Sequence, residues 1–486
     1  MLKKVTSTSQ KPSTFKIYGK RLIAILVCVL TITCSILVPT NASSLTTTRY
    51  VDCADTLTDV DLNLAIQTTV PRALYALVEL PADWWGWSYT PEQLRKAYLG
   101  APINYVGISD NGAVRTVGNK VVFPVIYDGG VIATILIGKY DGQIYSTYGN
   151  AIELGEAIAK NPGEDFVLLS ENQGAFVVTK EDDIIPLQQY PSTPTFSVAM
   201  QERRLNKSGS AFELLSTAET TISQHELFSN TISVQEAQSF YSVEANEARK
   251  SLETKGKAAP ETVLTAGENI MAKFDGNAEE ISYIEETSSA NFTLDLNGEP
   301  AIRPTAANNH GTATGDYLDS YQIVLQGNFN ICWAATIASV LRWEMPNRHG
   351  RITAINVVES TSHASIYRNT NYTGASQPFM RTTLDNYLPA SYIVNSSSSA
   401  RTRAQIRTAI NNEDPICMIL KSGSVRHAVA NCGYLDWTDG SFTIRIMDPN
   451  YTSFKMSEYQ SYGSSYYYTT PAGTRYKWNG SIYFTY

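Results

Sequence analysis

Gln326-Gly327-Asn328-Phe329-Asn330-Ile331-Cys332-Trp333-Ala334-Ala335 is the stretch from which the rest of the chain is best interpreted. From Trp333 to Trp343 the apolar residues recur at helical intervals, and Asn330 is placed to cap the first turn. This pattern predicts a helix with Cys332 at its N-terminus, where unpaired N–H groups and the helix dipole favour a reactive thiolate. Gln326 lies one short loop upstream. Its amide and the Cys332 N–H are therefore two donors that can converge on one oxyanion.

A candidate base for such a thiolate occurs later in the chain. The run from His427 to Tyr434 is mostly apolar and begins with the histidine, which predicts a strand. After a turn at 438–440, a second predicted strand over 441–447 ends at Asp448. Antiparallel pairing of the two strands would bring Asp448 beside His427. A cysteine, a base and a group that orients the base form a set suited to nucleophilic catalysis.

The order of these motifs resembles the papain superfamily of cysteine proteases. The resemblance is carried by Gln326, five intervening residues, Cys332-Trp333-Ala334, then His427-Ala428-Val429 and Asp448. The last third of the chain is most similar to staphopain-type and other bacterial secreted papain-like enzymes, and Asp448-Pro449 is similar to the corresponding ending in bacteriocin-leader-processing peptidases. The resemblance implies an α+β fold over residues 316–486, a papain-like two-lobe catalytic domain with a helical lobe and a curled antiparallel sheet.

The resemblance also implies a role for each site residue. Cys332 would be the nucleophile, His427 the base, Asp448 the orienting residue and Gln326 the oxyanion donor. Three positions depart from the family pattern: Phe329 replaces a cysteine, Asp448 replaces an asparagine, and Pro449-Asn450 stands where an aromatic residue is expected.

Two further residues are expected to bind substrate. Trp333 follows the nucleophile directly. Gly374 precedes a predicted helix over 378–387, and the resemblance suggests that it lets the substrate backbone approach on the non-primed side. A plain loop at the start of a helix is an equal alternative for Gly374.

Residues 1–42 have the pattern of a secretory signal peptide. Six basic residues and no acidic residue precede an apolar run from Leu22 to Val38, and Ala42 offers a cleavage position. An uncleaved membrane anchor is the alternative, since the apolar run approaches spanning length. Either way we expect an exported protein, secreted or attached to the cell surface.

The chain between the signal and residue 316 divides into two predicted parts. Residues 43–190 contain turns with glycine between apolar runs, among them Asp128-Gly129-Gly130 and Asp141-Gly142, which predict hairpins of an α+β N-terminal pro-domain. Residues 191–315 are polar and read as a partly helical linker or prosegment, with residues 190–260 forming an inhibitory helix pair across the cleft as an alternative. Activation cleavage is expected within 304–316, because a maturation site must be exposed.

Charge is unevenly distributed along the chain, whose net charge is −8. Residues 43–315 are strongly acidic, whereas residues 316–486 hold more basic than acidic side chains. This complementarity suits an acidic prosegment that inhibits its own enzyme, although acidity also simply keeps secreted proteins soluble. The Trp84-Trp85-Gly86-Trp87 cluster is either a binding surface or packing at a domain seam, and packing is favoured.

The remaining residues give no sign of cofactor chemistry. No His and Cys pair has metal-ligand spacing, and phosphate loops, dinucleotide fingerprints and basic nucleic-acid patches are missing from the sequence. Cys417 and Cys432 fall on predicted neighbouring strands, where a disulfide is possible but buried free thiols are favoured. We therefore expect a monomer without metal, cofactor or nucleic acid.

These features predict a secreted cysteine endopeptidase made as a zymogen. It would hydrolyse protein or peptide substrates through a thiolate–imidazolium pair and an acyl-enzyme. A secreted transamidase or cell-wall amidase that uses the same triad is one alternative. A non-enzymatic surface-binding protein, with its function in the N-terminal part, is the other.

Overall fold

The structure is a computed structural model. It describes residues 55–80, 82–86, 89–108, 114–171, 174–181, 183–187, 210–216, 220–274, 313–327, 329–370, 374–458, 461–462 and 465–485. The predicted signal peptide over 1–42 lies outside these residues, as do 275–312, which include most of the expected activation stretch. Among the described residues, we find no helix with the length and apolar character needed to cross a membrane.

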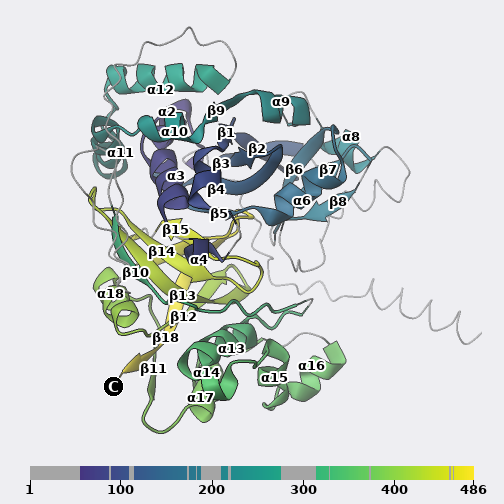
Figure 1. Cartoon of the computed structure of the whole chain (residues 1–486), viewed down its shortest axis with the longest axis vertical. Helices are drawn as coiled ribbons and strands as arrows, with labels where there is room; N and C mark the ends of the chain where they lie inside the picture. Colours follow the sequence, from purple (N-terminus) through teal and green to yellow (C-terminus); the bar gives the residue numbers. More distant parts are fainter. Residues whose placement is uncertain are drawn as a thin grey trace, which may run out of the picture. The chain divides into compact units, whose positions relative to one another are not determined.

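The N-terminal half, defined here as the described residues from 55 to 274, is a β-sheet with helices packed against it (Figure 1). Its helices are α2 (Asp59–Ile66), α3 (Thr69–Glu79), α4 (Ala82–Trp85), α5 (Pro91–Arg95), α6 (Ile152–Lys160), α8 (Ala211–Leu215), α9 (Gln224–Ser229), α10 (Val234–Ser239), α11 (Val243–Lys255) and α12 (Glu261–Phe274). Its strands are β1 (Tyr98–Gly100), β2 (Ile103–Ile108), β3 (Val114–Tyr127), β4 (Gly130–Tyr140), β5 (Gln143–Asn150), β6 (Phe166–Glu171), β7 (Gly174–Thr179), β8 (Ile184–Pro186) and β9 (Thr231–Ser233).

The predicted hairpins of this half are confirmed. Asp128-Gly129 joins β3 to β4 and Asp141-Gly142 joins β4 to β5, and all four residues have positive φ. Two-residue turns of this kind match the twist of antiparallel strands, which is why Asp-Gly predicted them. The resulting β3–β4–β5 meander is the centre of the N-terminal sheet.

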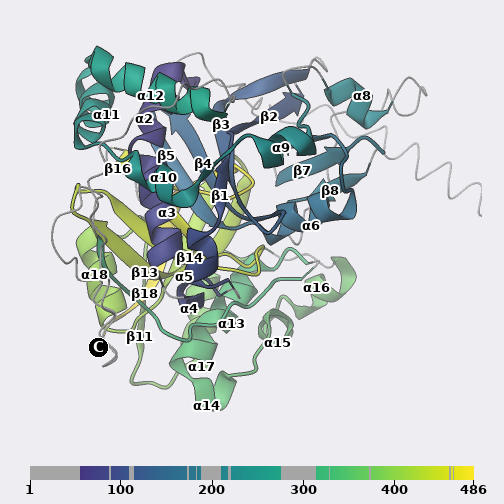
Figure 2. The same ribbon diagram turned by 45° about the horizontal axis from the view of Figure 1, so that its top comes forward.

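Helices from both ends of the N-terminal half cover one face of this meander. Helix α12 packs on α2 and α10 packs on α3 (Figure 2). Buried Ile270 and Phe274 of α12 join Leu74 and Leu77 of α3 in a core that also contains Phe123 of β3. The helices over 234–274 therefore lie on the N-terminal helices.

The C-terminal half, defined as the described residues from 313 to 485, places a group of helices against the end of a second set of strands (Figure 1). Its helices are α13 (Cys332–Glu344), α14 (Pro346–His349), α15 (Ala354–Glu359), α16 (Ala364–Thr370), α17 (Gln377–Tyr387) and α18 (Arg403–Asn411). Its strands are β10 (Ala313–Tyr317), β11 (Ile393–Ser397), β12 (Ile416–Ser422), β13 (Val425–Trp437), β14 (Phe442–Met447), β15 (Lys455–Glu458), β16 (Ser461–Tyr462), β17 (Ser465–Thr469) and β18 (Arg475–Thr485).

The predicted fold class, a papain-like two-lobe catalytic domain preceded by a separate α+β pro-domain, is wrong. Strand β5 of the N-terminal half pairs antiparallel with β15 of the C-terminal half, with Tyr148 opposite Met456. Each strand thereby satisfies the backbone groups of the other's open edge, which would otherwise be unpaired. The chain is instead a mixed α/β structure in which strands of both halves form one large, mostly antiparallel sheet, without a clear division into a helical and a sheet lobe.

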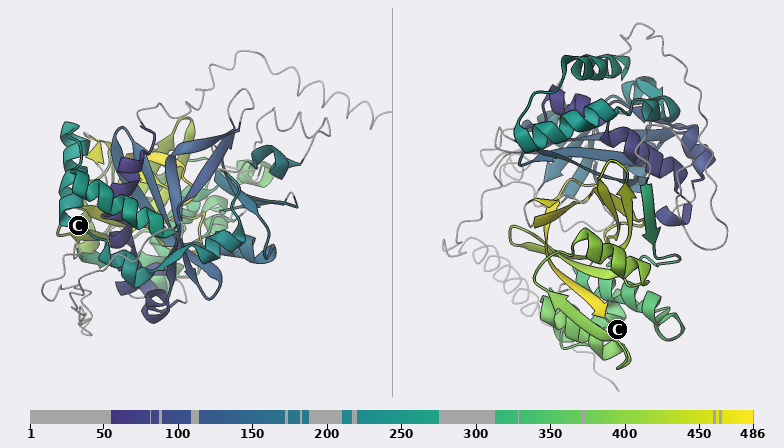
Figure 3. Two further views of the ribbon diagram at one scale, coloured as in Figure 1. Left: turned by 90° about the horizontal axis from the view of Figure 1, so that it is seen from above. Right: turned by 90° about the vertical axis from the view of Figure 1, so that its left-hand side faces the viewer.

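A shared core accompanies the shared sheet. Leu435, Trp437 and Met456 of the C-terminal half belong to the same buried cluster as Leu74 and Phe123. Figure 3 shows the β13–β15 region and the N-terminal strands from two further sides. Two other cores lie within the C-terminal half, one around α13, α15 and α17 and one beneath α18.

Candidate active site

Helix α13 begins at Cys332, as the sequence predicted. The predicted cap is wrong, because the N-cap residue is Ile331 and it makes no side-chain capping bond. Residues 333–341 are all buried, which anchors the helix in its core. Cys332 itself is a half-buried free thiol at the open end of this helix.

His427 and Asp448 form the predicted pair. Strand β13 carries His427, β14 ends at Met447, and the two strands pair with Ala430 opposite Met447. The Nε2 atom of His427 lies 2.9 Å from Oδ1 of Asp448, and both side chains are buried. Because Asp448 occupies Nε2, the other ring nitrogen, Nδ1, is left for Cys332.

The charges around His427 strongly favour its protonated form. Burial alone would lower the pKa of His427, but the Asp448 charge and hydrogen bonds to Asp448 and Cys332 raise it from 6.5 to about 10. His427 thus interacts with both partners at once. The arrangement suits an imidazolium held between a carboxylate and a thiolate.

Two tyrosines complete the surroundings of this pair, and sequence reasoning missed both. Tyr468 of β17 donates a hydrogen bond of 3.0 Å to Oδ2 of Asp448. The ring of Tyr476, at the start of β18, lies 5.5 Å from the His427 ring. Tyr468 is one of three consecutive tyrosines, so the sequence offers no signal that distinguishes it.

Gln326 belongs to the same network through its backbone. Its N–H donates to the carbonyl oxygen of Pro449 at 3.2 Å, and Pro449 follows Asp448 directly. The side chain is buried, and its Oε1 atom has no hydrogen-bond partner among the described residues. Gly327 has a φ of +67°, which lets the chain turn between Gln326 and the helix.

The two predicted substrate contacts, Trp333 of α13 and Gly374, lie in different environments. Trp333 is only 2 % exposed and contacts the rings of His363 and Phe379 at 5.7 and 5.5 Å, so its side chain packs in the core. Gly374 is exposed in the loop before α17. Phe379, in the first turn of α17, packs against Trp333 at the start of α13.

The other described cysteines, Cys417 and Cys432, and the described tryptophans of the 84–87 cluster have packing roles. Cys417 and Cys432 are free and buried, and Cys417 lies opposite Ala430 rather than Cys432. Trp84 and Trp85 are also buried, and Trp84 contacts Tyr317 of the C-terminal half at 4.3 Å. Trp87 lies outside the described residues.

Comparisons with family models and with curated proteins add no relative to this picture. No family model matches the chain, and no curated protein is significantly similar to it. Within the described part of the chain, no cluster of three His, Cys, Asp or Glu residues has an arrangement that would hold a metal ion. The interpretation of the site therefore rests on its own geometry.

Proposed function

We propose that the protein is a secreted cysteine endopeptidase made as a zymogen, with the papain-like order of residues noted in its sequence. One observation carries the proposal: buried His427 interacts with Asp448 on one side and with Cys332, at the start of α13, on the other. Three separate segments supply these side chains. A purely structural histidine has no need of both an acid and a thiol as partners.

In the proposed reaction, the Cys332 thiolate attacks the carbonyl carbon of a peptide bond. The backbone N–H of Cys332 and the amide of Gln326 stabilise the oxyanion. His427 then gives its proton to the leaving amine, which leaves an acyl-enzyme on Cys332. Water, deprotonated by His427, hydrolyses this thioester and restores the pair. Protein or peptide substrates are the expected partners, and the reaction requires no cofactor.

The zymogen part of the proposal concerns the linker. Strand β10 begins at Ala313 and pairs with β13 at five positions, so residues 313–316 are protected from cleavage. The activation cut is therefore proposed within 304–312, the part of the expected stretch that precedes β10. The acidic N-terminal segment remains the proposed intramolecular inhibitor, on the strength of the charge difference between the two parts of the chain.

The main alternative function is a surface-binding protein that uses the tryptophan cluster. The burial of Trp84 and Trp85 argues against it. An exposed aromatic patch would have favoured it. The transamidase and amidase alternatives use the same triad, so only the reaction product distinguishes them from an endopeptidase.

The test compares the full chain with its Cys332→Ala variant on an unfolded protein substrate and on purified peptidoglycan, with reductant present. Mass spectrometry of the products is expected to show internal cleavage of the protein by the wild type alone. Intact mass should also show the wild type shortening to about its last 170 residues. Cleavage of peptidoglycan only, or new isopeptide bonds, would replace the proposal with an amidase or a transamidase. Identical behaviour of both chains on every substrate would leave the binding protein.

A further inference from the structure

Tyr468 and His427 hydrogen-bond to different carboxylate oxygens of Asp448. Oδ1 of Asp448 accepts from His427 Nε2 and from the backbone N–H of Asn450, whereas Oδ2 accepts from the Tyr468 hydroxyl at 3.0 Å. Asp448 and Tyr468 are both fully buried. With a donor on each oxygen, the carboxylate cannot rotate away from His427 without breaking a buried bond to a charged group.

The Tyr468 hydroxyl remains a donor throughout the accessible pH range. Burial, and then the Asp448 charge, raises the pKa of Tyr468 well above its ordinary value. The other titratable groups that interact with Asp448 are His427, Tyr451, Tyr476 and Lys455. Burial also raises the pKa values of Tyr451 and Tyr476. Among these neighbours, Lys455 loses its charge near pH 8 and His427 near pH 10, whereas the tyrosines stay neutral over this range.

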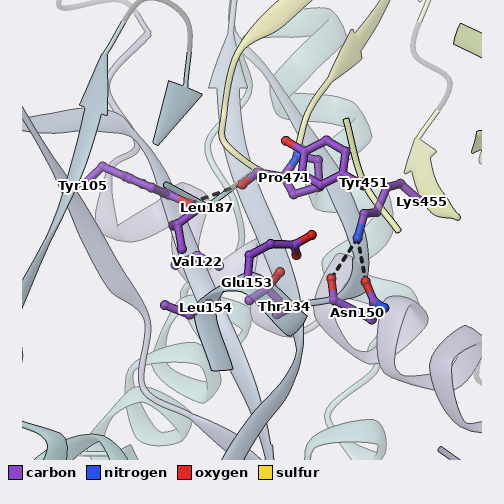
Figure 4. A pocket seen from close by; sticks show the side chains of 11 residues that line it. Tyr105, Val122, Thr134, Asn150, Glu153, Leu154, Leu187, Tyr451, Lys455 and Pro471 are labelled. Atoms are coloured by element: carbon purple, nitrogen blue, oxygen red, sulfur yellow. Dashed lines mark hydrogen bonds between the residues drawn. The ribbon is translucent and has the colours of Figure 1, made fainter. Parts of the chain in front are cut away.

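Lys455, which interacts electrostatically with Asp448, lines a small pocket between the two halves (Figure 4). Its Nζ atom donates to both the backbone and the side-chain oxygen of Asn150 on β5. Burial lowers the pKa of Lys455 to about 8. Because the Lys455 ammonium is hydrogen-bonded to Asn150 of β5, Lys455 forms part of the contact between the two halves.

The loop that follows Tyr468 is bonded by three side chains of the N-terminal half. Thr147 donates to the carbonyl of Thr469 at 2.6 Å. Tyr105 donates to the carbonyl of Pro471 at 3.3 Å, which Figure 4 shows, and Lys120 donates to that of Gly473 at 3.4 Å. This loop from Thr469 to Gly473 connects Tyr468 to Tyr476, the two tyrosines beside Asp448 and His427.

Gly473 is suited to this contact. Its φ is +82°, and a Cβ atom there would lie 2.2 Å from the Lys120 ammonium. A residue with a side chain would push Lys120 off the loop.

We propose that Tyr468 is a positioning residue for the Asp448–His427 pair, and that the N-terminal half holds Tyr468 in place by bonding the loop from Thr469 to Gly473. This inference rests on the proposed function, which makes His427 and Cys332 a reactive pair. In this role the N-terminal half, which is also the proposed inhibitor, supports the site for as long as it stays bound to the C-terminal half.

The first test uses Tyr468→Phe, with Tyr467→Phe on the same strand as the matched control. The rate at which iodoacetamide alkylates Cys332 in the full chain is measured from pH 4 to 10 by peptide mapping. Tyr468→Phe is expected to move the basic limb of this profile to lower pH by about one unit, since a freer Asp448 stabilises the His427 imidazolium less. Peptide hydrolysis should lose about tenfold in kcat with KM unchanged. Tyr467→Phe should superimpose on the wild type.

The second test addresses the N-terminal half. Thr147→Val removes the bond to Thr469 and is expected to shift the basic limb in the same direction by a smaller amount. Thr134→Val, a buried threonine on neighbouring β4, should leave the profile unchanged. If Tyr468→Phe does not fold, as judged by its near-UV circular dichroism, Thr147→Val decides the question.

Superimposable profiles for Tyr468→Phe and the wild type would overturn the positioning role, and superimposable profiles for Thr147→Val would overturn the part played by the N-terminal half. The His427→Ala variant separates these failures from a failure of the proposed function. If Cys332 reacts equally fast in the wild type and in His427→Ala at every pH, no reactive pair exists and both proposals are wrong.

Discussion

The three described cysteines lie in different environments, from which we expect different reactivities. Cys332 is half-buried next to His427. Burial raises the pKa of Cys417 to about 12 and that of Cys432 to about 11, so both are unreactive thiols near neutral pH.

Iodoacetamide at pH 7 is therefore expected to alkylate Cys332 at least tenfold faster than Cys417 or Cys432. The measurement is quantitative peptide mapping of the native chain after brief exposure. The same mapping in denaturant, where all three should react alike, is the control. Comparable labelling of Cys417 in the native chain would show that burial does not set these reactivities.

The protonation of His427 makes stability depend on pH. Its pKa in the folded chain is about 10 against an ordinary 6.5, so the folded state binds the proton more tightly than the unfolded state. The resulting stabilisation is complete below pH 6.5 and is lost as the pH rises through about 10.

Cys332→Ala keeps the Asp448 contribution that raises the pKa of His427, so we expect its free energy of unfolding to fall as the pH rises above 6.5. Urea unfolding at several pH values measures it. In a Cys332→Ala, His427→Gln double variant the slope should be shallower. Equal slopes in the two proteins would mean that His427 and Asp448 are not a charged pair.

At the level of elements, local sequence patterns predicted helices and tight turns well, but they did not predict which distant strands would pair. The 3.6-residue period predicted α13 to within a residue or two, and the Asp-Gly turns predicted β3, β4 and β5. The apolar pattern of residues 62–80 is typical of one continuous helix, but the structure divides it, because α2 ends at Ile66 and α3 begins at Thr69. The pairing of β5 with β15 could not be predicted, because the two strands lie about 300 residues apart. The local sequence of each segment indicates a strand but does not identify its partner.

The candidate site shows the same limit. Cys332, His427 and Asp448 could be found because their order and spacing match a known chemistry. Tyr468 and Tyr476 could not, because a tyrosine acquires its role only from the carboxylate or imidazole that the fold brings to it.

Gly149 tests the β5–β15 pairing. It lies opposite Lys455, and a Cβ at this position would come within 3.0 Å of the Lys455 side chain and 3.1 Å of the Phe454 carbonyl. Gly149→Ala is expected to lower the free energy of unfolding by about 1–3 kcal/mol, because the two strands must separate to admit the methyl group.

Gly130→Ala is the matched control for this substitution. Its Cβ would meet only the Tyr127 carbonyl, at 3.8 Å, so its effect on urea unfolding should be neutral or slightly stabilising. If Gly149→Ala is as well tolerated as Gly130→Ala, β5 and β15 are not paired closely in solution.

For the whole molecule, a buried ion cluster joins the two halves away from the site. Arg72 of α3 bonds Glu458 of β15 at 2.9 Å and also pairs with Asp439, in the turn before β14. Arg249 of α11 lies 3.6 Å from the same Glu458. These side chains are almost fully buried, so each charge depends on its partners.

Arg72→Leu should therefore cost about 3–5 kcal/mol of unfolding free energy, because it leaves two carboxylates buried with too little positive charge. Urea unfolding followed by tryptophan fluorescence measures this change. Arg95→Leu, which breaks an exposed pair with Glu79, is the control and should cost less than about 1 kcal/mol. Equal effects of the two substitutions would mean that the cluster does not join the halves.

The central claim is that Cys332, activated by His427, forms an acyl-enzyme. Its most direct test is the intact mass of the full chain after rapid acid quenching of its reaction with an activated peptide ester. The account predicts one acyl adduct in the wild type, mapped to Cys332, none in Cys332→Ala, and far slower formation in His427→Ala. An adduct that forms as fast without His427, or none at all in the wild type, would contradict it.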